Sequence, residues 1–266
     1  MHIVVCINYI PDPEAPAKQF RLDEATNRPV LSHAKPVIGP FDENAMELAL
    51  QLKDAVGAKV TALTLGAASH QEVLRRALAL RCDSAVHLKE ERAVELDSDA
   101  VARLLAAAIR TLGGADLVLC GRQVGDWDGG QVGQILSEEL GYGCVTLVRE
   151  FQPAGEGALR AVREVSGGVA LVEARLPAVA TATNTAANQL RIPKVKDTMA
   201  AFRMPITTLT PAELGVDVAA LLRDPACRVQ RMFTPEVAGQ VEMIGGDDDE
   251  QVAETLARRI LSLKVI

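Results

Sequence analysis

Residues 115–141, ADLVLCGRQVGDWDGGQVGQILSEELG, join a short apolar run to a helical pattern through a turn that is rich in glycine. The run at 115–121 predicts a buried strand, and the pattern at 134–140 predicts a helix. Strand followed by helix recurs along the first half of the chain. Such alternation requires parallel strands that are joined by right-handed crossovers. The pattern therefore predicts a doubly wound, mostly parallel α/β sheet.

The other expected elements of this half follow in the same rhythm. Strands are expected at residues 3–10, 59–66 and 84–89, and helices at 41–58, 72–80 and 98–114. Ser69 and Glu72 have the spacing of a capping box at the start of the second helix, and Asp97 or Ser98 is expected to cap the third.

The rhythm changes after Tyr142. Apolar and polar residues alternate in places at 145–152, 158–165 and 169–176, with a further strand at 177–184. This predicts a short antiparallel hairpin that is added to the sheet. Beyond residue 203 the pattern weakens until an amphipathic helix at 250–263. We therefore expect an α/β domain at 1–203 and an extended C-terminal arm at 204–266, which either wraps a partner or is a flexible tail.

Composition limits the classes of function. The chain has 266 residues, a net charge of −7 and only 3% aromatic residues, which argues against a nucleic-acid surface. No apolar run is long enough to span a bilayer. Five cysteines without a CxxC motif, and a start unlike a signal peptide, predict a cytoplasmic location. Cys6 and Cys120 lie in apolar runs, so they are expected to be buried rather than reactive.

The turn at 121–131 lies where open α/β sheets bind ligands, beyond the carboxyl end of a strand. Its glycines let main-chain amides approach an anion, the following helix offers the positive end of its dipole, and Arg122 adds a charge. The turn lacks the Lys-Ser or Lys-Thr pair of a triphosphate loop and does not match GxGxxG. It therefore predicts a phosphate or pyrophosphate cradle.

The other side chains of the turn leave alternatives open. Asp126 would repel a phosphate unless it faces a ribose hydroxyl or pairs with Arg122. Asp128 and Gln131 have the spacing of a capping box, so Asp128 could instead close its own helix. Trp127, the single tryptophan, could stack on a base or lie on the surface.

Several stretches together resemble the β subunit of electron-transfer flavoproteins, closely over residues 1–203 and more loosely in the tail. They are VVCINYIPD, GPFDENAMELALQLKD, RRALALRCDSAVHL, LVLCGRQVGDWDGGQVG and LPAVATATNTAANQLRIPKVKDTM. The fourth is similar to the family's nucleotide signature, and the fifth to its partner-recognition segment. The resemblance implies a Rossmann-like β subunit paired with an α subunit that holds a flavin. It competes with one other interpretation, a universal-stress-type nucleotide-binding module without a redox role.

By motif match, the resemblance implies an adenine nucleotide at a set of positions on several strand ends and turns. These are Cys6, Asn8, Gly39, Asp42, Leu65, Gly66, Cys120, Gly121, Arg122, Gln123, Val124, Asp126, Asp128, Gly129, Gly130, Gln131, Val132 and Gly133. Simple carriers of the family hold a structural AMP, whereas bifurcating relatives hold FAD. The run Gln131-Val132-Gly133 resembles the bifurcating form, so we expect FAD, with AMP as the alternative and NAD(H) as a substrate. No catalytic or metal-binding residue is expected.

Residues 191–199 resemble the loop that docks these carriers onto dehydrogenases of the acyl-CoA type or others. The resemblance implies that Arg191, Val195 and Met199 contact this partner, with Val195 at the apolar anchor position. The alternative is an ordinary amphipathic turn in which Val195 belongs to the chain's own core. The tail would then embrace the α subunit.

Overall fold

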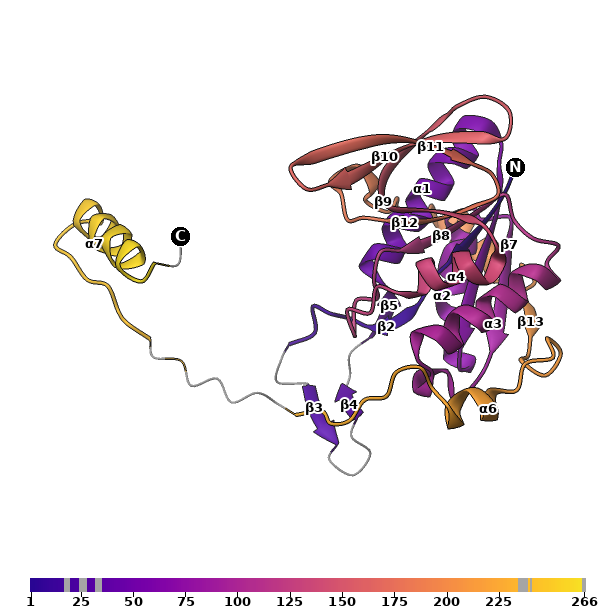
Figure 1. The fold of residues 1–266 in the computed structure, drawn as a ribbon, viewed down its shortest axis with the longest axis horizontal. Coiled ribbons are helices and arrows are strands. Elements are labelled where there is room, and N and C mark those ends of the chain that lie inside the picture. Colours follow the sequence, from indigo (N-terminus) through magenta and orange to yellow (C-terminus); the bar gives the residue numbers. More distant parts are fainter. Residues whose placement is uncertain (17–19, 24–27, 32–34, 234–238, 240, 265–266) are drawn as a thin grey trace. The chain divides into compact units, whose positions relative to one another are not determined.

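The computed structural model describes residues 1–16, 20–23, 28–31, 35–233, 239 and 241–264. These residues divide into two compact units, Met1–Gln230 and Arg231–Ile266. A nine-stranded sheet runs through the first unit in the order β11-β10-β9-β12-β8-β1-β6-β7-β13 (Figure 1). Its strands are β1 His2–Cys6, β6 Lys59–Gly66, β7 Ser84–Lys89, β8 Leu117–Gly121, β9 Gly143–Pro153, β10 Ala158–Val165, β11 Gly168–Arg175, β12 Ala178–Ala182 and β13 Thr207–Leu209.

Helices cover both faces of this sheet. They are α1 Pro40–Val56, α2 Gln71–Ala79, α3 Ser98–Thr111, α4 Val132–Leu140, α5 Val195–Ala201 and α6 Val218–Arg223, with short 3₁₀ turns η2 Ala68–His70, η3 Ala93–Glu95 and η4 Ala186–Asn188. One core cluster joins the sheet to α1 and α2, and a second joins the opposite face to α3 and α4. The predicted doubly wound α/β sheet is confirmed.

The antiparallel addition is larger than the expected hairpin. Three strands, β9, β10 and β11, form an antiparallel meander, while the first part of β9 also pairs in parallel with β12. The meander is therefore continuous with the parallel sheet. Two further pairs of short strands lie outside it: β2 Tyr9–Pro11 with β5 Pro36–Ile38, and β3 Phe20–Asp23 with β4 Arg28–Leu31.

The sheet continues beyond residue 203. Strand β13 pairs in parallel with β7, and Leu209, Leu214 and Leu221 pack against the second core cluster. The sequence pattern is weak here because β13 has only three residues. The second unit contains α7, Asp249–Ser262, whose N-terminus is capped by the Asp248 side chain.

One predicted helix cap is confirmed and another is wrong. Asp97 caps α3, since its carboxylate accepts a hydrogen bond from the amide of Ala100. The capping box at Ser69 and Glu72 is wrong: Ser69 lies inside η2, and α2 begins at Gln71 without a side-chain cap. A 3₁₀ turn satisfies the local amides there, because the amide of His70 donates to the carbonyl of Ala67.

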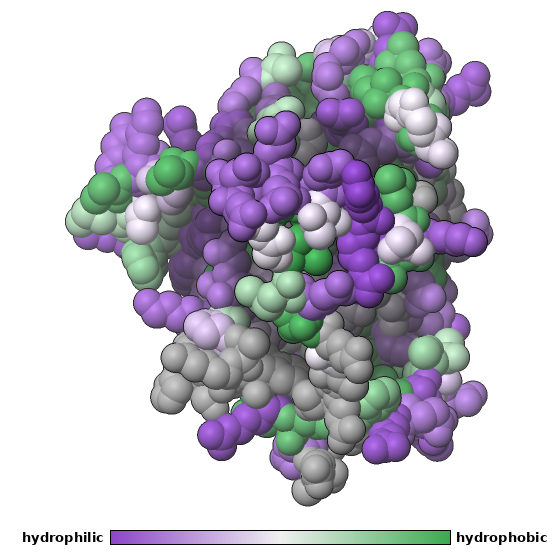
Figure 2. Space-filling view, turned by 90° about the vertical axis from the view of Figure 1, so that its left-hand side faces the viewer, coloured by the Kyte–Doolittle hydropathy of each residue, from purple (hydrophilic) through white to green (hydrophobic). Residues whose placement is uncertain are grey.

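The described surface is mainly polar. Figure 2 shows one face, on which hydrophilic side chains predominate and hydrophobic ones form separate patches. Within the described ranges, the structure contains no helix with the length and apolar character needed to cross a membrane.

Candidate functional site: the crevice where the strand order reverses

The candidate site lies between β1 and β8. From β1 the chain passes through α1 to β6 and through α2 to β7 on one side, and α3 then returns it to β8 on the other side of β1. The connections therefore extend the sheet toward β7 on one side of β1 and toward β8 on the other. In open α/β sheets, such a reversal opens a crevice at the carboxyl ends of the strands, and ligands bind there. Cys6 ends β1 and Gly121 ends β8, so both predicted residues border the crevice.

Asp42 joins the two sides of the crevice. Its Oδ2 accepts the amide of Asn8 at 2.9 Å, and its Oδ1 accepts the amide of Gly121 at 3.1 Å. Asp42 stands in the first turn of α1, which begins after Gly39. Burial raises the pKa of Asp42 to about 7, although the two amide hydrogen bonds oppose this shift. The carboxyl therefore fixes the spacing of the two strand ends.

Two glycines of the turn allow it to pack against the start of α1. A Cβ on Gly121 would lie 2.6 Å from Oδ1 of Asp42 and 2.8 Å from Cβ of Phe41. A Cβ on Gly125 would lie 2.8 Å from Ile10 and 2.9 Å from the ring of Pro40. These glycines therefore have a packing role in addition to the open cradle that the sequence predicts.

The end of the turn leads into the uncapped N-terminus of α4. The N-cap residue of this helix is Gln131, and no side chain accepts a hydrogen bond from its first turn. The alternative in which Asp128 closes the helix is wrong, because the Asp128 carboxylate instead accepts a hydrogen bond from the side chain of Gln123 at 2.7 Å. A bond from the amide of Val124 to the carbonyl of Gly129 closes the turn, whereas the amide of Gly130 has no hydrogen-bond acceptor among the described residues. Amides at a helix start attract anions.

The side chain of Arg122 carries positive charge to the start of α1. Its guanidinium carbon lies 4.8 Å from the centre of the Phe41 ring, which gives a cation–π contact. Its Nε is buried and has no hydrogen-bond partner among the described residues. Buried polar atoms almost always have a partner. A phosphate oxygen is a suitable partner, so this orphan atom fits the predicted anion site.

Asp126 does not form the ion pair with Arg122 that was one alternative, since no such pair occurs among the described residues. Its Oδ1 accepts the amide of Trp127 at 3.0 Å, and burial raises its pKa. Its charge also contributes to raising the pKa of Asp42, after the larger effect of burial. Trp127 is 48% exposed beside them.

Two cysteines lie on the strands that border the crevice. Cys6 and Cys120 are buried on the neighbouring strands β1 and β8. A hydrogen bond with Cys6, together with burial, raises the pKa of Cys120 well above its usual value. Because the thiolate is the nucleophile, this agrees with the predicted packing role.

The other predicted residues also lie around the crevice. Gly39 donates its amide to the carbonyl of Asn8, Leu65 and Gly66 end β6 next to β1, and Gly133 packs on Thr181 of β12. The structure thus brings the predicted nucleotide residues to one edge of the sheet. No sequence pattern indicates a role for Phe41 or Thr181 in the site. Only the fold brings Phe41 to Arg122 and Thr181 to Gly133.

A second surface surrounds α5. Arg191 binds Glu47 of α1 through a 2.7 Å ion pair and additional hydrogen bonds, and it also pairs with Asp54. These contacts raise the pKa of Arg191 above its usual value. Arg191 is therefore an anchor that attaches this segment to α1.

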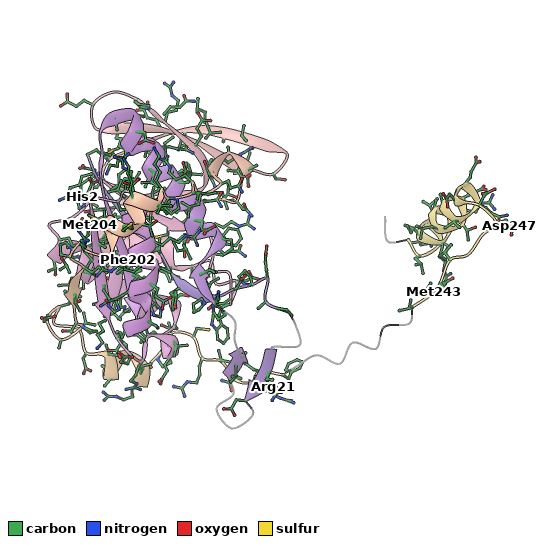
Figure 3. All side chains as sticks on the ribbon, turned by 180° about the vertical axis from the view of Figure 1, so that it is seen from behind. His2, Arg21, Phe202, Met204, Met243 and Asp247 are labelled. Carbon is green, nitrogen blue, oxygen red and sulfur yellow. The ribbon has the colours of Figure 1, made fainter. Side chains whose placement is uncertain are left out.

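Four apolar side chains beyond this anchor are exposed: Ile192 by 91%, Val195 by 78%, Met199 by 65% and Phe202 by 70%. Val195, Met199 and Phe202 have the four- and three-residue spacing of one helix face, and Ile192 lies three residues before α5; Figure 3 labels Phe202. We call these four residues the α5 stripe. The alternative in which Val195 belongs to the chain's own core is therefore wrong.

Hollows elsewhere in the first unit contain none of the predicted nucleotide residues. One of about 470 Å³ lies between α1 and the antiparallel meander, with Leu52, Phe151 and Val162 in its wall. Another lies between the end of β7 and the segment around Pro211.

The sequence of the chain is similar to those of known proteins over most or all of its length. The sequence model of the electron transfer flavoprotein domain matches residues 30–214. The chain is 30% identical over 276 residues to electron transfer flavoprotein subunit beta of Megasphaera elsdenii, covering all of both chains. It is 35% identical over 244 residues to Protein FixA of Bradyrhizobium diazoefficiens, covering 88% of this chain and 83% of the relative. It is 31% identical over 268 residues to caffeyl-CoA reductase-Etf complex subunit CarD of Acetobacterium woodii, covering all of both chains.

Proposed function

Since this chain belongs to the electron transfer flavoprotein family, as a β subunit, we propose that it pairs with an α subunit and binds an adenine nucleotide in the crevice between β1 and β8. Family membership decides against the universal-stress-type alternative. Two observations carry the proposal: the N-terminus of α4 is uncapped, and the buried Nε of Arg122, in the turn that leads to this helix, has no partner among the described residues. Together they provide amides and a positive charge for a phosphate group.

The residues around the crevice have separate roles in this proposal. The first turn of α4 and Arg122 hold the phosphate or pyrophosphate. Asp42 keeps the two strand ends at a fixed spacing through its two amide contacts. Asp126, which pairs with no cation among the described residues, accepts a hydrogen bond from a ribose hydroxyl.

FAD is the preferred nucleotide and AMP the alternative, on the basis of the Gln131-Val132-Gly133 run. A bound FAD would supply hydride acceptance from NADH and division of the electrons between the α-subunit flavin and a low-potential acceptor such as ferredoxin, whereas AMP would be structural. The chain itself contributes binding, orientation and electrostatics.

The α5 stripe is the proposed contact for a partner dehydrogenase, of the acyl-CoA type or another. Exposed apolar side chains on a short helix, held in place by the Arg191 anchor, suit a transient protein contact. The arm at 204–266 is the proposed contact with the α subunit, and Val241 and Met243 in its last part, the unit Arg231–Ile266, are strongly exposed. A cytoplasmic location stays a prediction.

The test is to purify the chain with its α subunit and to quantify the extracted nucleotides. Two FAD per heterodimer support the preferred form, and one FAD with one AMP supports the alternative. A colourless complex without nucleotide would contradict the proposal.

Variants then locate the site. We expect Arg122→Gln to weaken nucleotide binding by about 10- to 100-fold, which corresponds to one charge-assisted hydrogen bond. Arg160→Gln, an exposed arginine on β10, is the matched control and should leave binding unchanged. Asp126→Ala should also lower nucleotide retention, and unchanged occupancy would count against its assigned role.

A further inference from the structure

The imidazole of His70 closes the β6 end of the crevice. A Cβ built on Gly66 would lie 2.2 Å from Nε2 and Cδ2 of His70, so the ring stands directly over this glycine. The Tyr9 ring packs against it with centroids 5.1 Å apart and planes at 58°. The ring of His70 is therefore held between the end of β6 and the residue that follows Asn8.

Polar atoms without partners lie on the same face of the sheet. Thr64 Oγ1, His70 Nδ1 and His87 Nδ1 are buried and have no hydrogen-bond partner among the described residues. Thr64 and His87 are register partners on β6 and β7. Nε2 of His87 lies 2.9 Å from the carbonyl oxygen of Gly66, which can only accept, so Nε2 is the donor of this bond. Thr64 and His87 are fully buried, whereas His70 is partly exposed, so His70 is the residue of the three that a molecule in the crevice can contact.

An adenylate is long enough to extend from the proposed phosphate site to His70. The proposed phosphate site follows β8, and β1 separates β8 from β6 in the sheet. Two strand spacings amount to about 9–10 Å. A nucleoside monophosphate spans such a distance from its phosphate to its base. A phosphate at Arg122 therefore places the base beside Gly66 and His70.

We propose that His70 is a further residue of the nucleotide site, where its ring packs against the purine of the bound adenylate with Tyr9 as its support. This inference rests on the proposed function and holds for FAD and AMP alike, because both contain adenylate. Burial lowers the pKa of His70 to about 4, so the ring is neutral at physiological pH. A neutral ring contacts a purine without burying a charge.

The test uses the heterodimer after removal of its β-subunit nucleotide. Calorimetry measures the binding of AMP and of ribose 5-phosphate, which lacks the base. We expect His70→Ala to weaken AMP binding by at least about fivefold, as loss of a stacking contact does, and to leave ribose 5-phosphate binding unchanged. His70→Phe keeps a ring over Gly66 and should restore most of the AMP affinity.

His2→Ala is the matched control. His2 begins β1 at the opposite edge of the sheet, where it contacts Thr61 and the carbonyl of Gly114, so its loss should change neither affinity. An unchanged AMP affinity in His70→Ala, or an equal loss for both ligands, would overturn the role of His70. Failure of the unmodified complex to bind either ligand would instead refute the proposed nucleotide site.

Discussion

The packing role of Gly121 gives a sharp prediction for Gly121→Ala. The added Cβ would lie 2.6 Å from Oδ1 of Asp42, 2.8 Å from Cβ of Phe41 and 2.9 Å from the main-chain carbon of Phe41. Main-chain atoms cannot swing aside as the end of a side chain can, so β8 or the start of α1 must shift. Overpacking of this kind costs about 1–3 kcal/mol. A shift also weakens the bond from the Gly121 amide to Asp42, which contributes roughly 1.5–3 kcal/mol as a bond to a charged group.

Together these terms predict a loss of about 3 kcal/mol in the free energy of unfolding. For a chain of this size, each kcal/mol lowers the melting temperature by roughly 2–4 °C, so the expected decrease is about 6–12 °C. The assay is thermal unfolding followed by circular dichroism at one fixed protein concentration. Gly129→Ala in the same turn is the control, because its Cβ would meet its nearest atom at an ordinary 3.7 Å. Equal melting temperatures for the two variants would refute the packing argument.

Three further predictions follow from the geometry. Burial raises the folded-state pKa of Asp42 from 3.8 to about 7. Its contribution to stability should therefore decrease as the pH rises through this window, by up to about 1.4 kcal/mol per pH unit. In urea unfolding between pH 5 and 8, the free energy of unfolding should depend less on pH for Asp42→Asn. Val195→Ala should slow reduction by the cognate dehydrogenase roughly tenfold, since two methyl groups leave the contact. Val94→Ala changes another strongly exposed valine, on η3, and should leave stopped-flow rates unchanged. Arg191→Gln should lower the free energy of unfolding in urea by about 2 kcal/mol, because the buried Glu47 carboxylate loses its cation and solvent screens this pair only partly. Asp54→Asn removes an exposed carboxylate and should lower the free energy of unfolding much less.

Much of the candidate site could be predicted from the sequence because it depends on local patterns. The apolar run before Gly121 and the helical pattern after it place the turn at a strand end, and parallel strands place such ends along one edge. Asp97 shows the same locality, since its cap needs only the amide of Ala100. Asp128 shows the limit: its spacing to Gln131 fits a cap, but the fold of the turn brings it to Gln123 instead.

The sequence by itself determined the alternation of strand and helix, and therefore the doubly wound sheet and the edge at which we propose the nucleotide site. Periodicity and glycine spacing carry this information because they concern neighbours along the chain. Only the tertiary structure decided which distant groups meet there: Asp42 between Asn8 and Gly121, Arg122 over Phe41, and His70 over Gly66. These contacts join strands and helices that are far apart in sequence, and no local pattern records how their side chains meet across the crevice.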